Sequence, residues 1–283
     1  MYSVRGYKNP WTAKDPKMAQ ETMGARRFGR FNWLGTWTLA EREMRRFLSV
    51  ASQTLAAPII TAALFLLVFS VAIGPRRGDV MGVPFIDFLA PGILMMTVIQ
   101  NAFANTSSSI VIAKVQGNIV DTLMPPLSAG ELVTGYVAGA IARGLMVAVA
   151  IWLLMALVLG VGLAHPIWAL VFVLLGSTLL GGLGIVAAIF ANKFDQMAAI
   201  TNFIITPLSF LSGTFYSIAS LPPVMQAVTR FNPVFYLIDG LRFGVLGVSD
   251  SSPWLGLAVC VGTTALVLAL CWHWFRIGYR MKP

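Results

Sequence analysis

Residues 133–160 read VTGYVAGAIARGLMVAVAIWLLMALVLG and contain one charged residue, Arg143. A helix needs about 20 predominantly apolar residues to cross the roughly 30 Å hydrocarbon core of a bilayer. Inside hydrocarbon only helices satisfy their backbone hydrogen bonds locally, and the alternating pattern of a membrane barrel strand is absent. This stretch therefore predicts a membrane-spanning helix.

Five further apolar segments of similar length flank this one. They lie near residues 55–73, 87–108, 167–191, 198–218 and 254–275. The 283-residue chain is 57% hydrophobic and 11% charged, whereas globular proteins average roughly 25% charged residues. This composition argues against a soluble enzyme, and the presence of only two cysteines, Cys260 and Cys271, argues against a disulfide scaffold. The predicted fold class is an all-α polytopic membrane protein with six transmembrane helices.

The basic residues are concentrated on one proposed side of the membrane. Fifteen Lys and Arg residues fall on the proposed cytoplasmic side and four on the outer side, as the positive-inside rule expects for both termini in the cytoplasm. The net charge of +9 is therefore explained by attraction to anionic lipid rather than to nucleic acid. The first 30 residues lack an apolar period and are expected to form a mobile cytoplasmic tail.

Residues 31–50 have the pattern of an amphipathic helix. Trp33, Trp37, Ala40, Met44 and Phe47 recur at helical spacing, and the arginines of this segment avoid that stripe. This pattern predicts an interfacial helix on the inner membrane surface. A cytosolic helix that packs on protein is the alternative.

Two connections are too apolar to be ordinary solvated loops. Residues 109–132, on the cytoplasmic side, contain Pro125 and Pro126, which fix a sharp bend. Residues 219–253, on the outer side, are divided into short pieces by prolines. Because broken backbone at membrane depth must be covered by protein, this segment predicts an outer re-entrant or interfacial helical hairpin.

Polar residues form a stripe on two of the predicted spans. In the second span the stripe is Thr97, Asn101, Asn105 and Ser108, and in the fifth it is Asn202, Thr206, Ser209, Gly213 and Tyr216. Such residues act as interhelical hydrogen-bond glue worth about 0.6 kcal/mol each, or they line a path for a polar or amphipathic solute. Both interpretations remain open from sequence.

Arg143 lies about ten residues into the third span, where a charge is expensive. It must reach the interface, face water or pair, and Asp195 and Asp121 are the candidate partners. The chain has two histidines, which the topology places on opposite sides of the membrane, and no catalytic or metal-binding motif. It contains no Gly-Lys dipeptide and hence no phosphate-binding loop.

Four blocks of sequence carry a resemblance to a known family. They are FLAPGILMMTVIQNAFANTSSSI (88–110), KVQGNIVDTLMPPLSAGELVTGYVAGAIARG (114–144), ANKFDQMAAITNFIITPLSFLSGTFYSI (191–218) and LPPVMQAVTRFNPVFYLIDGLRFGVLGVSD (221–250). In their order and spacing they resemble the ABC-2 type permease family, which includes bacterial exporters of nodulation lipo-oligosaccharides, polysaccharides and drugs. The resemblance covers roughly residues 31–280.

The resemblance implies a transmembrane domain, here 51–283, that works as a homodimer with two copies of an ABC ATPase subunit. That partner would bind ATP and Mg²⁺, with no cofactor bound by this chain. It also implies that the second and fifth spans line the solute path. A cytoplasmic coupling helix would contact the ATPase, and its residues here would be Gln116, Gly117, Asn118, Ile119, Asp121 and Met124.

The sequence hypothesis is therefore the permease subunit of an ATP-driven exporter in the bacterial cytoplasmic membrane, moving an amphipathic, lipid-like, saccharide or drug solute. An ion-coupled secondary transporter is the first alternative, but it would need buried acids at span centres. A membrane-embedded lipid-modifying enzyme is the second, and it would need a convergent His, Asp or Cys group.

Overall fold

The computed structural model describes residues 31–74 and 78–280, so the tail predicted for 1–30 lies outside the described residues. Regular structure in the described part is helical, apart from one bridge between Val80 and Val83. The elements are α2 Trp33–Leu48, the π-helical η1 Ser52–Ala56, α3 Ala57–Ala72, α4 Phe85–Val115, α5 Ile119–Leu123, α6 Ala129–Leu159, α7 Pro166–Phe190, α8 Phe194–Ile200, the π-helical η3 Thr201–Ile205, α9 Thr206–Phe210, the 3₁₀ turn η4 Ile218–Ser220, α10 Pro223–Arg230, α11 Pro233–Leu246 and α12 Pro253–Ile277.

Five of the predicted spans are long, apolar helices in the described part of the chain. They are Ser52–Ala72 (η1 with α3), α4, α6, α7 and α12. In the segment predicted as a span at 198–218, α8, η3 and α9 follow one another without a gap and form one helical run from Phe194 to Phe210. This run is not among the long, apolar candidate spans of the described residues. The chain then turns at Gly213, whose positive φ of 79° is left-handed backbone that favours glycine. The count of six spans therefore stays a prediction.

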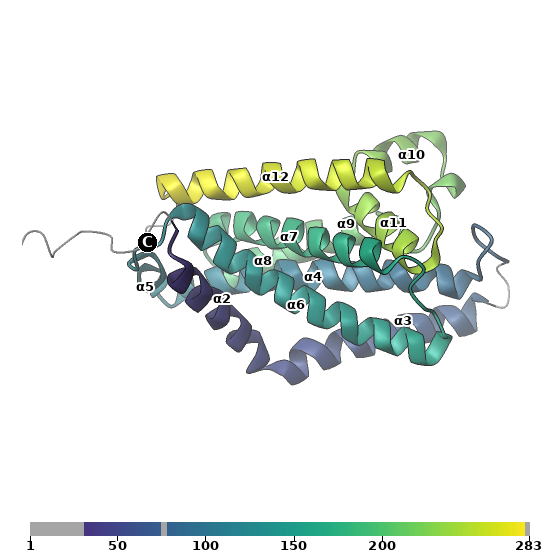
Figure 1. Cartoon of the computed structure of the whole chain (residues 1–283), viewed down its shortest axis with the longest axis horizontal. Coiled ribbons are helices and arrows are strands. Elements are labelled where there is room, and N and C mark those ends of the chain that lie inside the picture. The colour runs from purple at the N-terminus through teal and green to yellow at the C-terminus, as the bar shows by residue number, and fades with distance from the viewer. Residues whose placement is uncertain (1–30, 75–77, 281–283) are drawn as a thin grey trace, which may run out of the picture.

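Helix α4 is the buried centre of the bundle (Figure 1). In its most apolar stretch 78% of the residues are buried, against 11% for the span Ser52–Ala72. Helices α6, α7 and α11 pack around α4, and the Thr106 hydroxyl donates to the Gly181 carbonyl oxygen at 2.7 Å across the α4–α7 contact. The outer surfaces of α3 and α12 expose Leu64, Val71 and Leu266, as helices in contact with lipid do.

The bundle has two distinct ends in Figure 1. One end carries α2, α5 and the last turns of α12, and we call it the α5 end; the other carries α10 and is called the α10 end. Prolines start both α10 and α11, where the missing N–H of the first turn is tolerated. Helix α11 is buried against α4, α7 and α12, whereas α10 exposes Val224, Val228 and Phe231. Residues 219–253 thus contain two short helices rather than a loop.

Candidate functional site

Helix α2 packs on the bundle through a face that differs from the predicted stripe. Its buried residues are Thr36, Leu39, Ala40, Glu43 and Phe47. Trp33 and Trp37 were predicted to share a face with Ala40 and Phe47, but they are 76% and 61% exposed. The segment is therefore a helix with one face against α6 and α4 and with both tryptophans exposed, and its place on the membrane surface stays a prediction.

Two glycines of α6 allow α2 to approach closely. A Cβ atom at Gly135 would lie 2.7 Å from a Leu39 side-chain carbon, and one at Gly139 would lie 2.5 Å from the Glu43 Cβ. The G-x-x-x-G spacing thus forms a seat for α2 within one chain. The start of α2 is tied to the start of α6 as well, because the Asn32 N–H donates to Glu131 Oε1 at 2.6 Å.

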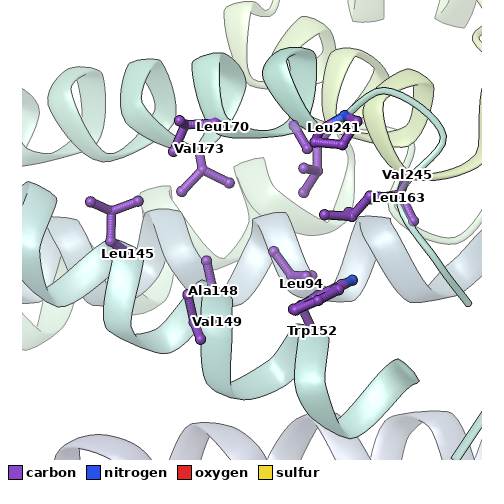
Figure 2. Close-up of a pocket in the computed structure, with 12 residues that line it drawn as sticks. Leu94, Leu145, Ala148, Val149, Trp152, Leu163, Leu170, Val173, Leu241 and Val245 are labelled. Atoms are coloured by element: carbon purple, nitrogen blue, oxygen red, sulfur yellow. The ribbon is translucent and has the colours of Figure 1, made fainter. Parts of the chain in front are cut away.

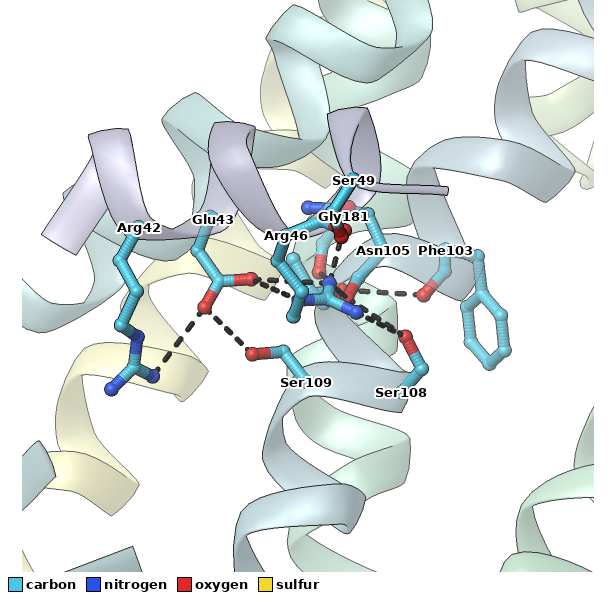
Figure 3. A network of polar contacts seen from close by, with 10 residues as sticks. Arg42, Glu43, Arg46, Ser49, Phe103, Asn105, Ser108, Ser109 and Gly181 are labelled. Carbon is cyan, nitrogen blue, oxygen red and sulfur yellow. Dashed lines mark hydrogen bonds and ion pairs between the residues drawn. The ribbon is translucent and has the colours of Figure 1, made fainter. Parts of the chain in front are cut away.

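A buried carboxylate joins α2 to α4 (Figure 3). Glu43 is fully buried and accepts from the Ser109 hydroxyl at 2.7 Å, from Arg46 at 3.2 Å and from Arg42 at 3.5 Å. A buried carboxylate needs such partners to offset its lost hydration. This α2–α4 network therefore fixes the rotation of α2 on the bundle.

Two members of the first predicted stripe belong to this network. Arg46 donates to the Asn105 carbonyl oxygen at 2.6 Å, to Asn105 Oδ1 at 3.2 Å and to Ser108 Oγ at 3.1 Å (Figure 3). Arg46 thus engages the oxygens of both residues, whereas Asn105 Nδ2 has no hydrogen-bond partner in the described part of the chain. For Asn105 and Ser108 the structure thus supports the interpretation as helix-to-helix glue.

The other two members, Thr97 and Asn101, line an open groove of about 390 Å³ between α3, α4 and α9. We call this the polar groove. Besides Thr97, Asn101 and Thr206, its polar lining includes Gln53, Thr61 and Gln100, and its apolar lining includes Phe65, Met96 and Phe210. The groove therefore joins one residue of the second stripe to two of the first. Its mixture of amides, hydroxyls and apolar groups suits a solute with both polar and apolar parts.

Arg143 pairs with a residue of this groove. Its Nη2 donates to Asn101 Oδ1 at 2.8 Å, and Asn101 in turn donates to the Thr97 carbonyl oxygen at 3.0 Å. The predicted pairing with Asp121 or Asp195 is wrong, because those acids lie on the short helices α5 and α8, whereas Arg143 is in the middle of α6. A neutral amide near mid-span is the acceptor that the arginine can reach.

The remaining members of the second stripe do not converge. Asn202 is exposed, and Ser209 donates to the Ile205 carbonyl oxygen at 2.7 Å on its own helix. The Tyr216 hydroxyl donates to the Leu211 carbonyl oxygen at 2.6 Å. The break after α9 separates Tyr216 from the helical register on which the stripe was drawn.

The predicted coupling residues lie at the α5 end. Gly117 ends α4 with a φ of +74°, and α5 follows with Ile119 buried and Met124 76% exposed. Gln116, Asn118 and Asp121 line an open pocket with Arg42, Arg45 and Arg46 of α2. The Arg42 guanidinium also donates to the Thr122 hydroxyl at 3.1 Å, so α2 and α5 are in contact.

A second buried charge cluster, at the α10 end, was missed by the sequence analysis. Arg242 is fully buried, stacks on the Phe88 ring at 3.9 Å and lies 3.7 Å from both Asp239 and Asp250. Burial raises the pKa of Asp239, while hydrogen bonds from Asp250 and Ser251 and the Arg242 charge oppose that rise. Arg242 also donates to the Gly213 carbonyl oxygen at 2.8 Å. The i, i+3 spacing of Asp239 and Arg242 in the sequence could have predicted this ion pair.

Glu43 was the other omission. It lies four residues after Leu39 and four before Phe47, so helical spacing alone would have placed it on a face with apolar residues. Within the described ranges, no group of three or more His, Cys, Asp or Glu side chains could hold a metal ion. The features left to carry function are the polar groove and the contacts at the two ends.

A bundle of long apolar helices with a polar groove at span depth is typical of a multi-pass membrane transport protein. The sequence matches the family described as "ABC-2 type transporter" over residues 35–246, and the chain belongs to that family. It is therefore the membrane component of an ABC transporter, a family role that is generally not enzymatic and that implies an ABC ATPase partner.

Named relatives agree with this assignment. The chain is 33% identical over 250 residues to the inner membrane transport permease YadH of Escherichia coli K12, covering 88% of this chain and 98% of the relative. It is 26% identical over 236 residues to nodulation protein J of Neorhizobium galegae, covering 82% and 88%. Nodulation protein J of Rhizobium leguminosarum bv. viciae is 24% identical over 224 residues, covering 77% and 84%. These likenesses and the apolar helices make the chain a multi-pass inner membrane protein.

Proposed function

We propose that the chain is the permease subunit of an ATP-driven exporter for an amphipathic solute that is lipid-like, a saccharide or a drug. The observation that carries the proposal is the polar groove, which holds six amide and hydroxyl side chains beside Phe65 and Phe210. Polar side chains at span depth are expensive unless they meet a partner or a solute. No charged side chain is among the residues that line the groove, which favours a solute with a neutral polar group.

A second copy of the chain would close the groove. The groove opens beside α3, whose Leu64, Leu67 and Val71 are more than half exposed. In a homodimer, two such faces would enclose one path between the subunits. Closed two-fold symmetry is the commonest way for identical chains to assemble.

The α5 end would face the cytoplasm, with both termini, and meet two copies of the ATPase. Gln116, Gly117, Asn118, Ile119, Asp121 and Met124 would form the contact, and ATP with Mg²⁺ would bind in the partner. Helix α4 is continuous from Thr97 at the groove to Val115 beside α5. A displacement of α5 would therefore shift α4 as a rigid body and so move the residues of the groove. Ligands shift the equilibrium between two such rigid-body arrangements in other proteins.

Membrane sidedness is tested first by cysteine labelling. Cys260 and Cys271 are fully buried, so little maleimide labelling of the native cysteines is expected. Met124→Cys and Phe231→Cys place exposed thiols at the α5 end and the α10 end, respectively. In intact cells a membrane-impermeant maleimide should label the Phe231→Cys thiol and spare the Met124→Cys thiol. Labelling of Met124→Cys instead would overturn the proposed orientation and the ATPase contact.

Coupling is tested in proteoliposomes that hold the chain with its ATPase, with a fluorescent alkyl glycoside as the transported probe. Asp121→Lys should lower ATP-driven uptake about 5- to 150-fold, the range of ordinary coupling free energies. Asp79→Lys, an exposed acid in the connection before α4, is the matched control and should leave uptake unchanged. Uptake that proceeds without ATP and collapses with an uncoupler would support an ion-coupled transporter instead.

A further inference from the structure

An apolar groove of about 140 Å³ lies between α6 and α7 near the α10 end (Figure 2). We call it the α6–α7 groove. Ala148 and Trp152 of α6 form one wall, Leu170 and Val173 of α7 form the other, and Leu94 of α4 and Leu241 of α11 form its floor. All its lining side chains are apolar except for the single indole nitrogen of Trp152. The groove is separate from the polar groove and shares no lining residue with it.

The groove is a fixed feature of the fold. The connection from α6 to α7 is held to the end of α11 by two backbone hydrogen bonds, Ala164 N–H to the Val245 carbonyl oxygen at 3.0 Å and His165 N–H to the Gly244 carbonyl oxygen at 2.7 Å. A Cβ atom at Gly244 would lie 2.5 Å from the Ala169 backbone nitrogen, so α11 and α7 are already in close contact. The α7 wall is therefore fixed against the α11 floor.

The groove opens onto the surface that meets hydrocarbon. Val149 and Leu170 at its rim are each about half exposed, and both belong to helices long and apolar enough to cross a membrane. Trp152 precedes the end of α6 at Leu159 by seven residues, or about 10 Å along the axis. The lining is almost wholly apolar, and an unfilled apolar groove forfeits dispersion contacts of its lining.

We propose that the α6–α7 groove binds one acyl chain of a bilayer phospholipid. An apolar cavity of about 150 Å³ in another protein stays dry and takes up benzene, so the volume here suits a short run of methylene groups. The bilayer is continuous with the rim of the groove and supplies such chains at high concentration. A chain held there fills the space between α6, α7 and the α11 floor.

The test is photolabelling in phosphatidylethanolamine vesicles doped with phosphatidylethanolamine that carries a diazirine in mid-chain. Label mapped by mass spectrometry should concentrate on residues 145–152 and 166–173 rather than on the exposed face of α12. Ala148→Phe, which fills the groove, should lower that labelling about five-fold, equivalent to roughly 1 kcal/mol. Val158→Phe, at an exposed position on the same helix, should leave it unchanged. Equal labelling of the groove and of α12 would overturn the proposal.

A second variant covers the case in which Ala148→Phe does not fold. The Trp152 indole nitrogen has no hydrogen-bond partner in the described part of the chain, so Trp152→Phe enlarges the groove without breaking a hydrogen bond. Vesicle lipid brominated in mid-chain should quench a component of tryptophan fluorescence that this variant lacks. Loss of the groove labelling on addition of the alkyl glycoside would identify solute as the occupant, and a Val149→Cys disulfide between two copies would identify a subunit contact. Either result would overturn the acyl-chain site.

Discussion

The two ends of the molecule hold buried charges in opposite arrangements. At the α5 end one carboxylate, Glu43, lies between Arg42 and Arg46. At the α10 end one guanidinium, Arg242, lies between Asp239 and Asp250. The Arg42 and Arg46 side chains are 49% and 29% exposed, whereas all three members of the other cluster are at most 4% exposed.

The difference indicates what each cluster does. The Arg242 cluster joins α11 to the turn at Gly213 and to Phe88 of α4, and no member reaches solvent, so any motion there would expose or strand a charge. The Glu43 network borders an open pocket and holds α2, which lies at the edge of the bundle in Figure 1. We therefore expect the helices at the α10 end to keep their relative positions and those at the α5 end to move during transport.

The largest expected effect comes from Arg242→Met. The change leaves Asp239 and Asp250 buried without their cation, and breaking a buried ion pair in this way costs about 3–5 kcal/mol. Loss of monodisperse protein or a large fall in the unfolding temperature in detergent should report it. Arg230→Met, an exposed residue at the same end, should leave both unchanged.

A triple variant sharpens this prediction. Asp239→Asn, Arg242→Met and Asp250→Asn together remove every charge of the cluster, and replacing a whole buried cluster is far less harmful than removing one partner. The triple variant should therefore be more stable than Arg242→Met alone. If it is less stable, the cluster acts through its hydrogen bonds rather than through charge.

Glu43→Gln should have the next largest effect. The amide keeps an acceptor for Ser109 but loses the charge opposite Arg42 and Arg46, and hydrogen bonds to charged groups are worth about 1.5–3 kcal/mol. Hydrogen exchange should become faster in α2 while α11 keeps its protection. Glu41→Gln, which loses only the exposed pair with Arg45, should change exchange little. Equal loosening of α11 would contradict the separation of the two ends.

Gly139→Ala tests the seat of α2 from the α6 side. The added Cβ would meet Glu43 at 2.5 Å; overpacking costs about 1–3 kcal/mol, and better helix propensity returns about 1 kcal/mol. A net loss of about 0–2 kcal/mol and faster exchange in α2 are expected. Gly130→Ala on the same helix, where the nearest atom is 3.8 Å away, should be neutral or stabilising. The prediction fails if the two alanines behave alike.

The sequence predicted the long helices well because an apolar run of span length has few alternatives. The spans near 87–108, 133–160, 167–191 and 254–275 all contain one continuous helix. At 198–218 it predicted a helix but not its end at Phe210, because hydropathy cannot detect a turn that depends on Gly213. Helix α4 also runs past the predicted end at 108 to Val115, and Lys114 in this extension donates to the Ala188 and Ile189 carbonyl oxygens at 2.8 Å each.

The candidate site could be predicted only where helical spacing alone places residues on one face. Helical spacing placed Thr97 and Asn101 on one face, and they do line one groove with Thr206. It could not separate them from Asn105 and Ser108, because that separation is made by Arg46, which comes from another helix. The roles assigned to the coupling residues and the path remain predictions.

The smallest expected effect on stability is at the groove itself, where Asn101→Leu removes the acceptor of Arg143. Arg143, unlike Glu43, is only partly buried, so the loss should lie near the average of about 0.6 kcal/mol for hydrogen bonds between membrane helices. The fold should therefore survive, as it should in Arg143→Leu. Both variants should still insert, yet both should lower ATP-driven uptake of the alkyl glycoside. If the two residues act as a unit, the double variant should be no worse than either single one, since contacting residues are not additive. Full uptake by Arg143→Leu would mean that the arginine only extends toward the membrane surface and has no part in transport. The functional contrast would then rest on the α5 end alone.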